Sequence, residues 1–251
     1  MLFFFKRNKV VIDAFTAMPL LTEMSPIQPT KKFLPQWWKD LPKTIDVKRP
    51  DHQITTKRGT LKICDGFLDY NKTGFIIPMW SDLKIATTKN GNWTYAYPSE
   101  NTYPIVDHPA NQYGSHFSQF INMKIISPWA FHEKTGTNFL WTTPTWYMSH
   151  LWGKLNILPG TVNYKFHHST NIPMFVPKRD DVIELKHGEP LIHLVPLTEK
   201  EVKIQMHQVS YEEFLQKTNG SSFNRMFIGS YKTHKKTVAE KEKSKCPFGF
   251  K

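Results

Sequence analysis

The sequence predicts one mainly β domain, in which two antiparallel sheets pack as a β-sandwich or in a jelly-roll-like arrangement. Three observations predict this all-β fold class. Eighteen prolines are spread along the 251 residues, and proline ends or kinks a helix. Short runs rich in β-formers recur roughly every eight to fifteen residues, with Pro, Gly or Asn between them. Aromatic residues make up 14% of the chain, a composition that disordered chains lack.

The clearest β signal covers residues 60–98. GFIIPMW (74–80) and LKIATT (83–88) are short β-rich runs, and Asn90-Gly91 is the strongest two-residue hairpin signal. After this turn, Trp93, Tyr95 and Tyr97 alternate with smaller residues, so they are expected on one face of a strand. Cys64 is expected inside an apolar strand of this segment, as an inert buried thiol.

Further strands are predicted from residue 117 onward. FSQFINMKIISPWAF (117–131) predicts a strand that ends at Pro128, and TNFLWTTP (137–144) and YMSHLWGKLNILPGTVNYKF (147–166) follow it. Six tryptophans lie in or beside predicted strands, and most of them are expected in the core while a minority could line a groove. They are Trp80, Trp93, Trp129, Trp141, Trp146 and Trp152.

Helix is expected only in short pieces near residues 35–41 and 210–218. In the first piece, Pro35 favours a helical turn after it, and Trp37 or Trp38 is expected to point inward as a plug over the core. In the second, Ser210 is an N-cap candidate that Glu213 would complete as a capping box.

Residues 1–230 are expected to form the β-rich domain and residues 231–251 a lysine-rich C-terminal tail. The net charge of +12 suggests an acidic partner such as nucleic acid. Only Arg225 lies beyond Arg179, and base readout relies on arginine, so nucleic acid is a disfavoured partner. Two cysteines suit a reducing cytosol, and no apolar run is long enough to span a membrane.

The segment DVIELKHGEPLIHLVPL (181–197) carries His187, Glu189 and His193, residue types that non-haem iron enzymes use as ligands. Gly188 and Pro190 suit a tight turn between two apolar runs. His193 lies a strand's rise away from the turn, on the order of 13 Å for four residues. The segment is therefore predicted to be a hairpin, with the side chains of His187 and Glu189 solvated at its tip.

A second group of histidines is the candidate metal site. Asp107, His108 and His116 fall in VDHPANQYGSHF (106–117), and His167-His168 end another predicted strand. Loops on a β scaffold often carry function, so Asp107, His108, His116, His167 and His168 are the candidate ligands of an iron or zinc ion. With eleven histidines in the chain, chance clustering competes with this hypothesis.

The order of PQWWKDLP, GFIIPMWSDLKI, INMKIISPWAFHEKTGTNFLWTTP, ILPGTVNY and IELKHGEPLIHLVPL resembles an uncharacterised protein family of T4-like phages of marine bacteria, which also occurs in some bacteria. The resemblance covers roughly residues 10–230 and speaks to the fold, since no activity or catalytic residue comes with it. It implies a phage gene product located in the host bacterial cytoplasm or in the virion.

Three functions remain open from the sequence. The first is a non-catalytic accessory or virion-associated protein that binds a phage or host protein through a groove of the β-sandwich. The second is a non-haem, iron-dependent enzyme of the jelly-roll oxygenase type, which the ligand spacing disfavours. The third is a nucleic-acid binder that uses the basic tail.

Overall fold

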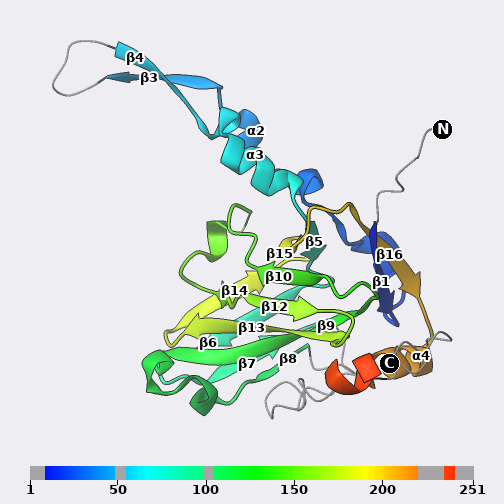
Figure 1. Ribbon diagram of the computed structural model, residues 1–251. Helices are drawn as coiled ribbons and strands as arrows, with labels where there is room; N and C mark the ends of the chain where they lie inside the picture. Colours follow the sequence, from blue (N-terminus) through cyan, green and yellow to red (C-terminus); the bar gives the residue numbers. More distant parts are fainter. Residues whose placement is uncertain (1–8, 49–54, 99–103, 148, 220–234, 241–251) are drawn as a thin grey trace, which may run out of the picture.

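The computed structural model describes residues 9–48, 55–98, 104–147, 149–219 and 235–240 (Figure 1). Its body consists of two layers of β-sheet that face each other across one apolar core. A narrow arm projects from this body. The mainly β fold class and the sandwich-like domain are as the sequence predicts. No helix in the described ranges has the length and apolar character that would let it cross a membrane.

The first layer is one sheet in the order β11-β13-β9-β1-β16, with β8 also paired to β9. Its strands are β1 (Val10–Thr16), β8 (Ile105–Asp107), β9 (Phe120–Glu133), β11 (Asn156–Ile157), β13 (Ser169–Pro177) and β16 (Val202–Gln208). The pair β1–β16 is parallel and the other pairs are antiparallel. The long strand β9 holds the layer together because it pairs with β13, β8 and β1.

The predicted end of β9 at Pro128 is wrong, because the strand continues to Glu133. Its pairing with β13 shifts register between Ser169 and Asn171. Pro128 faces this irregular stretch, so no ladder hydrogen bond requires the N–H that proline lacks. A proline inside a strand is tolerated where the ladder is already interrupted.

The second layer consists of two sheets, in the orders β12-β10-β15-β5-β2 and β14-β6-β7. The strands of the larger sheet are β2 (Gln28–Pro29), β5 (Phe75–Pro78), β10 (Asn138–Thr142), β12 (Gly160–Asn163) and β15 (Pro190–Pro196). Those of the smaller sheet are β6 (Leu83–Thr87), β7 (Trp93–Ala96) and β14 (Asp181–Leu185). The Asn90-Gly91 hairpin between β6 and β7 is confirmed, with Gly91 at φ 86°.

The KHGEP segment is a turn but not a hairpin, which corrects the prediction. The flanking strands do not pair with each other: β14 pairs with β6, and β15 pairs with β5. The segments β5–β6 and β14–β15 thus form one ribbon that crosses from the smaller sheet to the larger. At the crossing, the Met79 N–H donates to the Glu189 carbonyl at 2.7 Å and the Gly188 N–H donates to the Met79 carbonyl at 2.8 Å. Gly188 has φ 79°, which glycine adopts without strain.

His187 is consequently not a free side chain at a hairpin tip. Its residue is exposed, yet its ring Nε2 lies 2.7 Å from the Ser25 hydroxyl. Its backbone N–H donates to the Asp82 carboxylate at 2.8 Å. His187 therefore ties the crossing of the ribbon to the segment that follows β1.

Both layers contribute to one apolar cluster, in which Trp129, Phe131, Phe139 and Tyr164 are among the largest fully buried side chains. Trp93, Tyr95 and Tyr97 share one face, as predicted, and pack against this cluster. Of the six tryptophans expected mostly in the core, Trp80, Trp129 and Trp141 are buried, Trp93 and Trp146 are partly buried, and Trp152 is 59% exposed.

Helix is short, but more of it is present than predicted. The labelled α-helices are α1 (Leu21–Met24), α2 (Gln36–Asp40), α3 (Asp65–Lys72) and α4 (Tyr211–Asn219). Single 3₁₀ turns are η1 (Thr30–Phe33), η2 (Leu61–Ile63), η3 (Ala110–Tyr113), η4 (Ser115–Phe117) and η5 (Ser149–Leu151). Helices α2 and α4 confirm the two predicted pieces, and the Ser210 hydroxyl accepts the Glu213 N–H as the predicted N-cap.

Helix α3 lies within residues 60–98, where the sequence predicts strands. Phe67 and Asn71 are its buried residues, four positions apart on one helix face. Two buried positions are too few for a visible helical period. Cys64 is exposed at the start of α3 rather than buried in a strand, which corrects that prediction.

The arm consists of the two-stranded sheet β3 (Thr44–Lys48) and β4 (Thr55–Gly59), with α2, η2 and α3 at its base (Figure 1). Trp37 and Trp38 do not plug the core as predicted. They pack with Phe67 and Trp146 at the base of the arm, where the Trp38 and Phe67 rings stack at 5.7 Å.

Most of the predicted basic tail lies outside the described residues. Residues 235–240 are helical, and the ammonium group of Lys235 lies 5.2 Å from the centre of the Phe166 ring.

Candidate functional site

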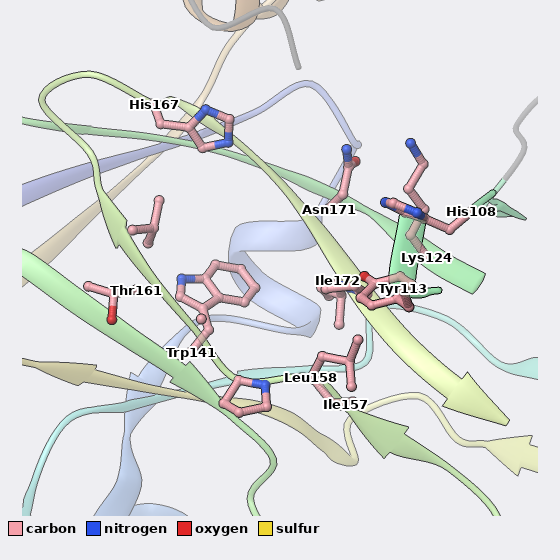
Figure 2. Close-up of a pocket in the computed structure, with 14 residues that line it drawn as sticks. His108, Tyr113, Lys124, Trp141, Ile157, Leu158, Thr161, His167, Asn171 and Ile172 are labelled. Carbon is pink, nitrogen blue, oxygen red and sulfur yellow. The ribbon is translucent and has the colours of Figure 1, made fainter. Parts of the chain in front are cut away.

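A cavity of about 190 Å³ lies at the edge of the sandwich where the chain passes from one layer to the other (Figure 2). Strand β11 pairs with β13 in the first layer, and β12 pairs with β10 in the second. The Leu158 N–H donates to the Pro173 carbonyl at 2.9 Å. Beyond Leu158, the segment that follows β11 turns away from β13. The stretch of β13 at Asn171–Pro173 then borders the cavity.

The wall of the cavity is mainly apolar. Trp141, Ile157, Leu158, Pro159, Val162, Ile172, Pro173 and Tyr113 supply its apolar side chains. The indole of Trp141 is held by its neighbours, because its Nε1–H donates to the Tyr164 hydroxyl at 2.6 Å and its ring meets Phe131 edge-on at 6.4 Å. The ring is therefore a rigid apolar surface, and its single donor is already bonded inside the protein.

Three polar residues of the lining gather at one end of the cavity. Figure 2 shows Lys124, Asn171 and His108 close together there, while Trp141 lies toward the opposite side. Lys124 and Asn171 come from the outer face of the first layer, since Met123 and Ile172 beside them point into the core. His108 follows β8, and its backbone N–H donates to the Asn122 carbonyl at 3.0 Å.

The two imidazoles on the wall are neutral near pH 7. Burial, and then the adjacent Lys124 ammonium, lower the pKa of His108, which a hydrogen bond with Gln112 partly offsets. Burial, and then the charge of neighbouring His168, lower the pKa of His167 to about 4. Lys124 is therefore the cationic group of the wall, and an anion would meet one positive charge beside polar, uncharged rings.

The structure brings only two of the five predicted metal ligands to this cavity, His108 and His167. Figure 2 shows them at separate ends of it. Asp107 accepts the indole N–H of Trp93 at 2.8 Å, and His116 is exposed in η4. These two residues do not line the cavity.

His168 lies in a different environment. Its ring stacks on His132 at 3.8 Å, and its Nδ1 lies 3.0 Å from the Phe131 carbonyl. Across the described ranges, no group of three or more His, Cys, Asp or Glu side chains is placed to hold a metal ion. The iron or zinc site stays a prediction, with His108 and His167 as the two ligands that share a cavity.

Lys124, Asn171 and Thr161 were not among the site residues predicted from the sequence. A signal for Lys124 was present, because it is the one charged residue within the apolar run FINMKII (120–126), where alternation places it on the face opposite the core. No local signal marks Asn171 or Thr161, since their place on the wall depends on how β12 and β13 approach each other.

A scan against models of known protein families finds no match to this chain, and a search of curated proteins finds no relative.

Proposed function

We propose that this protein is a non-catalytic binding protein whose β-sandwich holds a small organic anion with an apolar, ring-sized body. The observation that carries the proposal is the cavity, with the fixed Trp141 indole on its wall and Lys124 at its polar end. Sites for drug-sized ligands measure about 300–1,000 Å³. A cavity of about 190 Å³ therefore suits a ligand with one ring and one carboxylate.

The division of the wall supports a binding role. The apolar body of the ligand would displace water from Trp141 and its neighbours, which favours binding. The carboxylate would lie beside Lys124 and accept a hydrogen bond from the Asn171 amide, and charge-assisted hydrogen bonds of this kind are the strong ones. We further propose that the protein acts as a phage accessory protein in the host bacterial cytoplasm or in the virion, which the resemblance to a phage family supports.

Calorimetric titration with benzoate, toluene and benzylamine tests this function. These probes share a ring and differ in charge. Benzoate is expected to bind, toluene to bind more weakly, and benzylamine not to bind. Lys124→Gln should weaken the binding of benzoate by about tenfold or more and leave the binding of toluene unchanged. A tenfold change corresponds to about 1.4 kcal/mol. Thr161→Phe, at an exposed position on the rim, should block both.

The matched control is Lys203→Gln, which removes one exposed lysine on β16 and leaves the cavity unchanged. The proposal would be refuted if Lys124→Gln and Lys203→Gln weakened benzoate binding equally, or if no ring compound bound. Metal content of protein purified without a tag tests the second function. If the wild type holds stoichiometric iron or zinc and His108→Ala abolishes it, the metal enzyme becomes the better-supported function.

A further inference from the structure

The arm is a two-stranded sheet that stands away from the body (Figure 1). Eight of its ten strand residues are exposed, and Val47 and Thr56 are partly exposed. In the part of the chain that the structure describes, neither β3 nor β4 pairs with a further strand. An isolated two-stranded ribbon is marginally stable in water, and its open edges are available to a partner.

The base of the arm is fixed to the body, because the Trp37 indole N–H donates to the Trp146 carbonyl at 3.1 Å. Further contacts hold the base together. The ammonium group of Lys62 donates to the Lys39 carbonyl at 2.8 Å and lies 4.3 Å from the centre of the Trp38 ring. The Thr60 N–H donates to the Lys43 carbonyl at 3.0 Å, where the two strands leave the base. The arm is therefore presented at a set angle, which reduces the ordering cost of binding.

The charge of the arm and its base is positive. Residues 36–48 and 55–63 contain six Lys or Arg and two Asp. Lys43, Lys48, Lys57 and Arg58 are exposed. The whole chain carries a net charge of +12, so a second copy would meet this arm with charge of the same sign. Charge complementarity favours an anionic partner.

The basic residues are distributed over both faces of the ribbon. Ile45 pairs with Arg58, and Asp46 pairs with Lys57. Because paired residues share a face, Arg58 lies on one face and Lys57 on the other. A protein partner would cover one face, whereas a nucleic-acid groove presents phosphates on both sides of an inserted element.

We propose that the β3–β4 arm binds double-stranded nucleic acid by entering a groove of the duplex. The major groove of B-DNA, about 12 Å wide, admits a two-stranded β-ribbon. Arg58, on the face with Ile45 and Val47, contacts phosphates on one side of the groove, and Lys48 and Lys57, on the opposite face, contact phosphates on the other side. This interaction is separate from the cavity and from the basic tail.

The test is the fluorescence anisotropy of a short labelled DNA duplex at about 50 and about 200 mM salt. The variant is Lys57→Gln/Arg58→Gln. Its matched control is Lys200→Gln/Lys203→Gln, which removes two exposed charges from the body. Each lost phosphate contact reduces the slope of log K against log salt by about 0.9. The arm variant is expected to lower the slope by about 1.8, and the body control to leave it unchanged.

A second variant replaces residues 44–59 with two glycines, because the Lys43 and Thr60 backbones already meet. Its circular dichroism and melting temperature should match those of the wild type, and duplex binding should be lost. Equal weakening by the arm and body variants, or no duplex binding at low salt, would overturn the proposal. So would equal displacement by poly-glutamate, which indicates an acidic protein partner, or a concentration-dependent dimer that the shortened variant lacks, which indicates a second copy.

Discussion

Glu133→Ala is expected to destabilise the protein severely, because one buried carboxylate organises the turn between the two layers. Glu133 ends β9 and is 3% exposed. Its Oε1 accepts the Thr135 N–H at 2.5 Å, and its Oε2 accepts the N–H groups of Gly136 and Thr137 at 2.7 and 3.0 Å. These three bonds close the segment that carries the chain from β9 to β10.

The magnitude follows from the number of donors. A hydrogen bond to a charged group contributes about 1.5–3 kcal/mol, and a donor left buried without a partner costs about 1–3 kcal/mol. With partial hydration of the turn, the loss of all three bonds is expected to cost about 3–5 kcal/mol. Glu133→Gln keeps one accepting oxygen but turns an NH₂ group toward N–H donors. Its free energy of unfolding should therefore lie between those of the wild type and Glu133→Ala.

Urea denaturation followed by tryptophan fluorescence measures the free energy of unfolding. The matched control is Glu199→Ala at an exposed position, which should change it by less than about 0.5 kcal/mol. For a chain of this size, a loss of about 4 kcal/mol lowers the melting temperature by roughly 10 °C. The reasoning is refuted if Glu133→Ala is no more destabilising than Glu199→Ala, or if the glutamine variant is the worse of the two.

Three further predictions concern backbone geometry and pH. Gly74→Ala is expected to lower the free energy of unfolding by about 2 kcal/mol or more, because Gly74 has φ 80° and an added Cβ would meet a backbone oxygen of β15. The control is Gly160→Ala, where an added Cβ would lie in open space. Equal effects of the two substitutions in denaturant melts would contradict the reasoning. Gly188→Val has open space too but φ 79°, so thermal melts should show a strain cost of roughly 1–2 kcal/mol, and an unchanged melting temperature would argue against it. Burial first, and then the charge of their common neighbour His168, lowers the pKa of His132 and of His167 to about 4. The unfolded state therefore binds protons at these histidines more tightly than the folded state does. The free energy of unfolding should be at its full value above pH 6.5 and should fall as the pH drops toward 4. Stability measured by urea melts at several pH values should decline less in a His167→Gln variant, and an identical decline would exclude His167 as a contributor.

Local rules in the sequence determined those parts of the protein that depend on a few neighbouring residues. Asn90-Gly91 makes a hairpin because Gly91 adopts a positive φ. Ser210 begins α4 because its hydroxyl accepts an otherwise unsatisfied N–H. Alternation places Trp93, Tyr95 and Tyr97 on one face, and the all-β class follows from many such short elements.

Only the tertiary structure decided which strands pair and which side chains meet. The two apolar runs around Gly188 look like the arms of a hairpin, but each finds a better partner far away in the chain, in β6 and in β5. Pro128 could remain inside β9 because the partner strand shifts register opposite it. His108 and His167 reach one cavity while His168, adjacent in sequence, stacks on His132. Such outcomes depend on competition among long-range contacts, whose free energies are set by the packing of the whole core and not by any local pattern of residues.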